Sequence, residues 1–203
     1  MHTSSSSATD LLPGLRAATG EAHLRLEQAV NIEQRLKDQA SYAELLKMFL
    51  GFYRPLEERL EAADGLEEHG YRLTERRKTP WLAADLRALG LSHAEVNALP
   101  NCRDLPTLKG VARSFGCLYV LEGATLGGRQ ITSLMRETPV PEDARRFFAS
   151  YGPETGTRWR EFIATLEAAG RATGEAGGVE IAEAARETFA SMERWINERV
   201  PRP

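Results

Sequence analysis

The spacing of apolar residues is the feature of this sequence that most narrows the folds open to it. In residues 11–30, apolar side chains recur every three or four positions and build one stripe along a helix. Asp10 before this segment and Pro13 in its first turn are typical of a helix N-terminus. The pattern therefore predicts an amphipathic helix whose apolar stripe consists of Leu12, Leu15, Ala18, Ala22, Leu26, Ala29 and Val30.

The same period returns along the rest of the chain. Ser41 and Ser92 are each followed three residues later by a glutamate, which is a typical capping box. In the last third of the chain two more helices are predicted, with residues 170–178 as the linker between them. The other predicted helices run from Ser41 toward Leu60, from Thr79 to Leu89, from Ser92 onward and from about Thr107 to Arg136.

Patterns typical of β-structure are nearly absent. The sequence has no sustained alternation of β-branched residues and no Asn-Gly or Asp-Gly hairpin turn. A chain of 203 residues is by default one domain. We therefore predict an all-α fold, with a disordered Ser-rich tail over residues 1–10 and a single multi-helix domain over residues 11–203.

The composition argues against several classes of partner. The net charge of -3 supplies no cationic excess for nucleic acid or an anionic membrane surface. No apolar run approaches the roughly 20 residues that span a bilayer, and the N-terminus lacks the apolar core of a signal peptide. Cys102 and Cys117 form neither a CxxC pair nor a Cys/His cluster. We expect a cytoplasmic protein that binds neither nucleic acid nor membrane.

Familiar catalytic motifs are missing as well. A carboxylate-bridged di-iron bundle needs Glu-x-x-His on two helices, and the sequence contains none. A G-x-S-x-G nucleophile turn and a phosphate-binding glycine loop after a strand are also absent. Any chemistry must therefore come from a less common arrangement of side chains.

His23 is the histidine best placed to act as a ligand. It lies in the middle of the first predicted helix, beside the apolar stripe, and Arg16 stands two helical turns before it on nearly the same face. An imidazole in this position can ligate iron while the guanidinium pairs with an anionic group about 10 Å away. The alternative is a structural histidine at the border of the helix.

The second unusual feature is a helical segment rich in glycine. Gly116, Tyr119, Gly123 and Gly127 fall on one helix face at spacings of three and four. Each glycine inside a helix costs about 1 kcal/mol relative to alanine, so some gain should offset it. A helix face with so few side chains allows close approach of a flat ligand. It is equally consistent with tight helix packing or with a helix break at Gly127 and Gly128.

These two segments resemble those of heme oxygenases, and the resemblance covers most of the chain. Residues 15–27, LRAATGEAHLRLE, are similar to the proximal helix whose histidine ligates heme iron. Residues 119–128, YVLEGATLGG, are similar to the glycine-rich distal helix over the opposite heme face. The sequence of this distal segment is most similar to that of bacterial members, especially those associated with bacteriophytochromes.

The resemblance implies a function and a set of site residues. Heme would be both cofactor and substrate, consumed with O2 and electrons from an external donor to yield biliverdin, CO and ferrous iron. The donor would be a ferredoxin or a reductase, and a bacteriophytochrome would be a possible recipient of biliverdin. The metal ligand would be His23, the catalytic residues Gly123, Gly127 and Thr125, and the heme-binding residues His23, Arg16, Tyr119, Gly123, Gly127, Gly128 and Phe189.

One departure from the family pattern concerns proton delivery. Mammalian-type members carry an acidic residue directly after the first distal glycine, and this sequence has Ala124 there. Thr125, Glu122 or backbone groups with water are the candidates to replace it. The departure leaves open an alternative in which the protein binds or carries heme without cleaving it. A third reading, a heme-free helical protein, assigns the glycines and His23 to structure alone.

Overall fold

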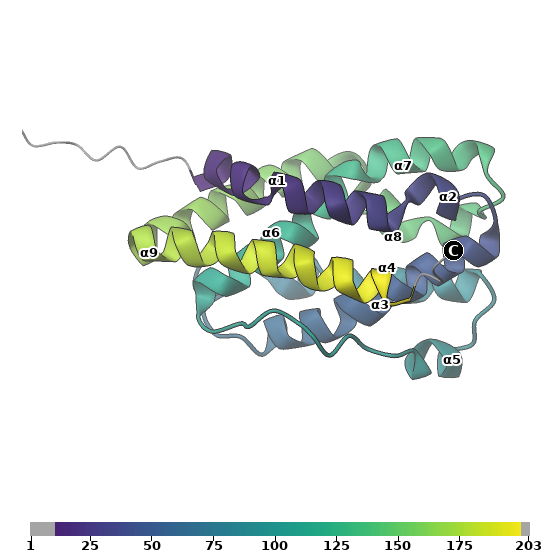
Figure 1. Cartoon of the computed structure of the whole chain (residues 1–203), viewed down its shortest axis with the longest axis horizontal. Coiled ribbons are helices and arrows are strands. Elements are labelled where there is room, and N and C mark those ends of the chain that lie inside the picture. Colours follow the sequence, from purple (N-terminus) through teal and green to yellow (C-terminus); the bar gives the residue numbers. More distant parts are fainter. Residues whose placement is uncertain (1–10, 200–203) are drawn as a thin grey trace, which may run out of the picture.

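The computed structural model describes residues 11–199, so the tail predicted over residues 1–10, with its cap Asp10, lies outside the described residues. Between residues 11 and 199 every regular element is a helix, which confirms the predicted all-α class (Figure 1). The longer helices are α1 (Leu11–Val30), α3 (Gln39–Glu61), α4 (Thr79–Ala88), α6 (Val111–Gly123) and α9 (Thr155–Asn197). The shorter ones are α2 (Ile32–Arg35), α5 (His93–Ala98), α7 (Gly128–Leu134) and α8 (Arg146–Ala149), with 3-10 turns η1 (Leu73–Glu75), η2 (Ala124–Gly127), η3 (Met135–Glu137), η4 (Glu142–Ala144) and η5 (Gly152–Glu154).

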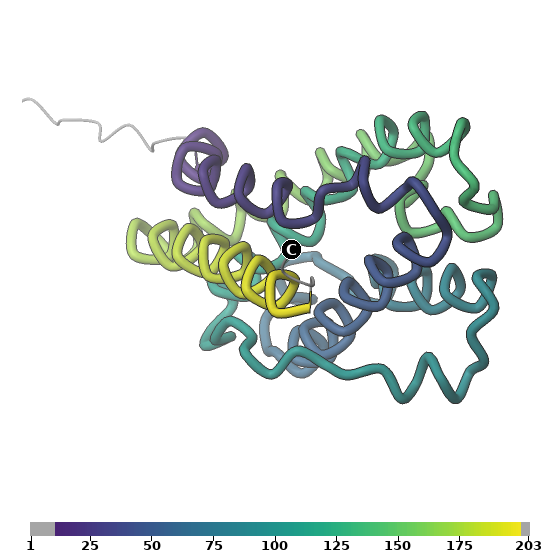
Figure 2. The backbone as a smooth tube through the Cα atoms, turned by 45° about the vertical axis from the view of Figure 1, so that its right-hand side comes forward, coloured from purple at the N-terminus to yellow at the C-terminus, as the bar shows by residue number. Residues whose placement is uncertain are grey.

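The long helix α9 is the centre of the packing. It contacts both α6 and α1 over much of their length, while α3 packs chiefly against α4. Figure 2 shows α1 and the C-terminal half of α9, which are the two ends of the described chain, running side by side. α1 docks on α9 through its predicted stripe, since Leu15, Ala22 and Leu26 are buried. The period of the sequence thus places one face of α1 in the core and leaves the neighbouring face for other contacts.

Two predicted helix starts differ from the observed ones. α3 begins at Gln39 instead of Ser41, because the carboxylate of Asp38 accepts a hydrogen bond from the Ser41 backbone N–H at 2.7 Å and so caps the helix. The helix predicted from Thr107 begins only at Val111, after Gly110 with a φ of 84°. The capping box predicted at Ser92 is confirmed at the start of α5.

The segment expected to link two C-terminal helices is itself helical. α9 extends from Thr155 to Asn197, and only Gly174 departs from helical geometry, with φ 69° and ψ −165°. A residue with a side chain rarely adopts these angles, so a single glycine supplies the bend that the sequence suggested as a nine-residue linker. The two predicted helices are therefore both present as the two halves of α9, and they meet at a kink at Gly174 instead of across a linker of nine residues.

Close helix packing explains one glycine of the predicted strip. A Cβ on Gly116 would lie 2.3 Å from the carbonyl oxygen of Ile181, so the missing side chain lets α6 and α9 approach each other closely. Within residues 11–199, every helix is too short or too polar to span a bilayer.

Candidate functional site

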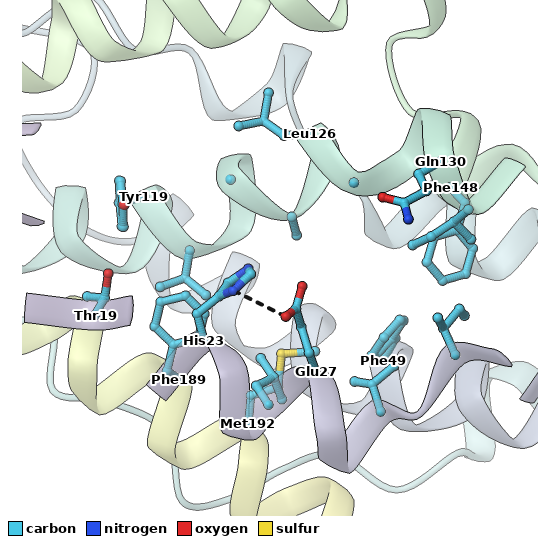
Figure 3. A pocket seen from close by; sticks show the side chains of 18 of the residues that line it. Thr19, His23, Glu27, Phe49, Tyr119, Leu126, Gln130, Phe148, Phe189 and Met192 are labelled. Atoms are coloured by element: carbon cyan, nitrogen blue, oxygen red, sulfur yellow. Dashed lines mark ion pairs between the residues drawn. The ribbon is translucent and has the colours of Figure 1, made fainter. Parts of the chain in front are cut away.

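A cavity of about 540 Å³ lies between α1 and the segment formed by α6, η2 and α7. Aromatic side chains of α3 and α8 and residues of α9 also line it, and the cavity is open to solvent on one side. Figure 3 shows α1 along one wall, with His23 and Glu27, and the glycine-rich segment along the opposite wall. The cavity joins the two segments that the sequence singled out, although they lie about a hundred residues apart in the chain.

His23 lines this cavity from α1. Its Nδ1 lies 3.7 Å from a carboxylate oxygen of Glu27, one turn further along the helix (Figure 3), and its side chain is 54% exposed. The ring of Phe189 meets the imidazole edge to face, with 5.7 Å between the centroids. Glu27 and Phe189 thus lie beside the imidazole, and no protein atom within residues 11–199 occupies a hydrogen-bond position at its second ring nitrogen, which can bind a ligand in the cavity.

The opposite wall owes its shape to a 3-10 turn within the glycine-rich helical segment. α6 ends at Gly123, η2 follows over one turn, and α7 starts at Gly128. Gly123 and Gly127 both line the cavity, and a Cβ built on either would meet no protein atom closer than 3.9 Å. Protein packing therefore does not require glycine at these two positions, and the space that their side chains would take belongs to the cavity.

Two residues expected at the site lie behind this wall. Thr125 is buried and its hydroxyl donates a hydrogen bond to the carbonyl oxygen of Glu122 at 2.6 Å. A Cβ on Gly128 would lie 2.1 Å from the carbonyl oxygen of Phe148, so this glycine permits close packing of α7 against α8. Neither Thr125 nor Gly128 lines the cavity. Thr125 and Gly128 thus shape the wall from behind, whereas Ala124, at the position that is acidic in mammalian-type members, lines the cavity.

The other expected binding residues are brought together at the cavity. Arg16 lines it from the start of α1, Tyr119 from α6 and Phe189 from the second half of α9. Tyr119 lies near Thr19 at one end of the cavity (Figure 3). Arg129, which follows the glycine pair, is exposed and does not line the cavity.

Several lining residues carry no sequence pattern that identifies them. Trp159 of α9 packs beside Tyr119, with 6.0 Å between ring centroids, and it is the residue nearest to the Cβ position of Gly123. Two polar residues also line the cavity, Gln130 from α7 and Glu33 from α2. They belong to separate helices, so only the packing of those helices places them at one site.

Glu122 is held away from the cavity by a buried cluster of donors. Its carboxylate accepts hydrogen bonds from Tyr71 and Tyr151, at 3.1 Å each, and pairs with Arg76 at 3.0 Å and with Lys78. Burial lowers the pKa of Lys78, while the Glu122 charge opposes that shift. Glu122 is only 1% exposed and is not among the cavity-lining residues. It therefore serves to anchor the end of α6, which makes it a poor candidate for proton delivery in the cavity.

The aromatic wall of the cavity depends on a buried aspartate. Asp85 of α4 accepts hydrogen bonds from the backbone N–H groups of Arg146 and Phe147, both at 2.8 Å, and so fixes the start of α8. α8 in turn presents Phe147 and Phe148 to the cavity. Burial is the largest effect on this carboxyl and raises its pKa from 3.8 to about 6, although both hydrogen bonds oppose the shift.

This raised pKa predicts a pH-dependent stability. Because the folded protein binds the Asp85 proton more tightly than the unfolded chain does, this contribution is fully present below about pH 4 and is lost as the pH rises through about 6. The loss amounts to at most about 3 kcal/mol. Urea unfolding of wild type and Asp85→Asn at pH 4 to 7 should therefore show a flatter pH dependence in the variant. Asp64→Asn, at an exposed position, is the control, and parallel curves for wild type and Asp85→Asn would contradict the prediction.

Comparisons with known proteins agree with this arrangement. A family model described as heme oxygenase matches residues 9–198. A heme oxygenase of Xanthomonas campestris pv. campestris (strain 8004) is 38% identical over 108 residues, which are 50% of this chain and 61% of that protein. The chain thus spans about three fifths of the length of this curated relative.

Solved structures resemble the chain over nearly its whole length. The NO- and CO-bound heme oxygenase from Neisseria meningitidis superposes with a TM-score of 0.79 at 21% identity, covering 95% of this chain and 92% of that one. A heme oxygenase from Leptospira interrogans gives a TM-score of 0.74 at 17% identity, covering 94% of this chain and 100% of that one. At such identities the likeness supports the fold.

Proposed function

This chain belongs to the heme oxygenase family, and from that premise we propose that it cleaves heme, with O2 and electrons, to biliverdin, CO and ferrous iron. The observation that carries the proposal is the position of His23 across one cavity from Gly123 and Gly127. A flat macrocycle needs an iron ligand on one face and a wall without side chains on the other, and these residues supply both.

The residues of the cavity fit this substrate. Phe49, Phe147, Phe148 and Met192 give an apolar lining, and Leu126 and Leu134 are large apolar side chains that remain 46% and 41% exposed at its border. Exposed apolar groups beside an apolar cavity favour an apolar ligand that covers them. Arg16 and Tyr119 supply groups that bind the propionate carboxylates through charge-assisted hydrogen bonds.

The roles of the remaining residues follow from their contacts. Bound heme supplies the iron that reacts with O2, and Glu27 orients the imidazole of His23 toward it. Gly123 and Gly127 leave room for O2 beside the macrocycle. Phe189 packs against the imidazole of His23 and lines the cavity. Thr125 and Gly128 act from behind, where they stabilise the 3-10 turn between α6 and α7.

The reaction also requires partners, an electron donor and a recipient of biliverdin, which the cavity does not identify. The electrons come from an external ferredoxin or reductase, since the sequence has no flavin or iron–sulfur motif. The sequence of residues 119–128 favours the bacteriophytochrome-associated type of heme oxygenase, in which a phytochrome receives the biliverdin. The cytoplasmic location stays a prediction.

The test is a titration of hemin into the purified protein, followed by a reductant in air. We expect a saturable shift of the Soret band and then its loss, with growth of the absorption of biliverdin. A saturable shift without bilin would favour a heme carrier, which the Ala124 position on the cavity wall keeps as the second candidate. The absence of a shift would overturn both.

A further inference from the structure

The charges that line the cavity are separated along its length. Arg16 stands near the start of α1, whereas Glu27 lies more than two turns further along and Glu33 lies beyond the end of the helix. Since α1 rises 1.5 Å per residue, about 20 Å of helix separates Arg16 from Val30, where the cavity still follows α1. Arg16 and Glu33 are therefore at opposite ends of the cavity.

The backbone turn after α1 is what brings Glu33 to this position. Asn31 adopts left-handed angles, φ 45° and ψ 60°, and α2 starts directly after it. Ile32 and Glu33 of the first turn of α2 then line the cavity, whereas the next residue, Gln34, does not. Glu33 is exposed, so its carboxylate places a solvent-accessible negative charge at the border of the far end.

The two ends differ in polarity as a result. Among the lining residues in the described part of the chain, Arg16 is the single lysine or arginine. The phenol of Tyr119 lies near Thr19 (Figure 3), which is three residues after Arg16 on α1. The far end holds the amide of Gln130 and the aromatic side chain of Phe148 (Figure 3), and Glu33 lines the cavity from the first turn of α2, which follows α1. A ligand with carboxylates on one edge is attracted to the first end and repelled from the second.

We infer that Glu33 is a specificity-determining residue that holds the heme in one in-plane orientation, with both propionates toward Arg16 and Tyr119. The inference rests on the proposed function. Rotation of the macrocycle about the His23–iron axis would bring a propionate toward Glu33 and Glu27, where like charges oppose it. One orientation presents one meso carbon to the reacting O2, so Glu33 restricts the enzyme to one principal biliverdin isomer.

Charge variants at Glu33 test this directly. Glu33→Lys replaces repulsion by attraction at the far end, and Glu33→Gln removes the charge alone. Gln34→Lys is the control because it places a lysine on the same short helix outside the cavity, and it changes the net charge by the same amount as Glu33→Gln. The probe is a hemin that is symmetric about its α–γ axis, so that flipping the macrocycle leaves its spectrum unchanged. Proton NMR of the ferric cyanide complexes then counts the in-plane orientations from the heme methyl resonances.

We expect one dominant set of resonances in wild type and in Gln34→Lys. In Glu33→Lys the ratio of a second set to the first should rise roughly 1.5- to 5-fold, as for an exposed ion pair, with a smaller rise in Glu33→Gln. Turnover of native hemin should yield a second biliverdin isomer in matching proportion. An unchanged ratio in both Glu33 variants that still bind hemin would overturn the inference but leave the proposed function intact, whereas wild type that binds no hemin would overturn the proposed function itself.

Discussion

Replacing His23 with alanine is expected to abolish bilin formation and the spectrum of histidine-ligated heme. His23 is the one histidine that lines the cavity within residues 11–199. Mutation of a residue that only hydrogen-bonds to a metal ligand typically lowers metal affinity or activity roughly 10- to 100-fold. Loss of the ligand itself should therefore have a larger effect. Hemin should still enter the cavity weakly, because Arg16 and the apolar lining remain.

Spectral titration and a turnover assay with imidazole added in solution measure this effect. Removal of the His23 side chain leaves space beside Phe189, so free imidazole should restore part of the spectrum and of the turnover. His93→Ala is the control, because this exposed histidine on α5 does not line the cavity. A His23→Ala protein with the wild-type spectrum and rate would exclude His23 as the ligand.

Alanine at Gly123 or Gly127 is expected to impair heme binding without destabilising the fold. Both glycines have helical angles, with φ of −59° and −72°, and a Cβ at either site meets no protein atom within 3.9 Å. The free energy of unfolding should therefore stay constant or rise by up to about 1 kcal/mol, the helix preference of alanine over glycine. A methyl group that intrudes on a tightly bound macrocycle costs about 1–3 kcal/mol, or roughly 5- to 150-fold in hemin affinity.

Gly116→Ala is the matched comparison and should show the reverse pattern. Its Cβ would lie 2.3 Å from the Ile181 carbonyl oxygen and 2.7 Å from the Ala184 side chain, so α6 and α9 must separate. We expect a loss of about 1–3 kcal/mol in unfolding free energy by urea denaturation, as for overpacked cores. If Gly123→Ala and Gly127→Ala were as destabilising as Gly116→Ala, the glycines would serve packing, and the ligand-binding role would be wrong.

Much of the site was predictable from residue patterns because those patterns are local. The period of residues 11–30 places Leu15, Ala22 and Leu26 in the core and puts His23 beside that stripe. Arg16 reaches the same cavity because two turns of one helix bring it to nearly the same face. These relations depend on the geometry of a single helix, which the sequence by itself determines.

The glycines show what only the tertiary structure decided. Gly116 and Gly123 share a face in the sequence pattern, yet one contacts the α9 backbone and the other faces the cavity. Gly127 and Gly128 are adjacent, yet the first lines the cavity and the second packs on Phe148. A glycine's role depends on what approaches it, and the approaching atoms belong to helices that are distant in the sequence.

The same reason explains the residues that patterns did not identify. Trp159, Gln130 and Glu33 lie on three different helices and meet only at the cavity, and Glu122 is drawn to Arg76 and Lys78 on another segment. Hydrophobic period and capping residues specify each helix through contacts within a few positions. The site depends on how helices pack, and that packing is set by the shape of whole faces, which the local pattern does not record.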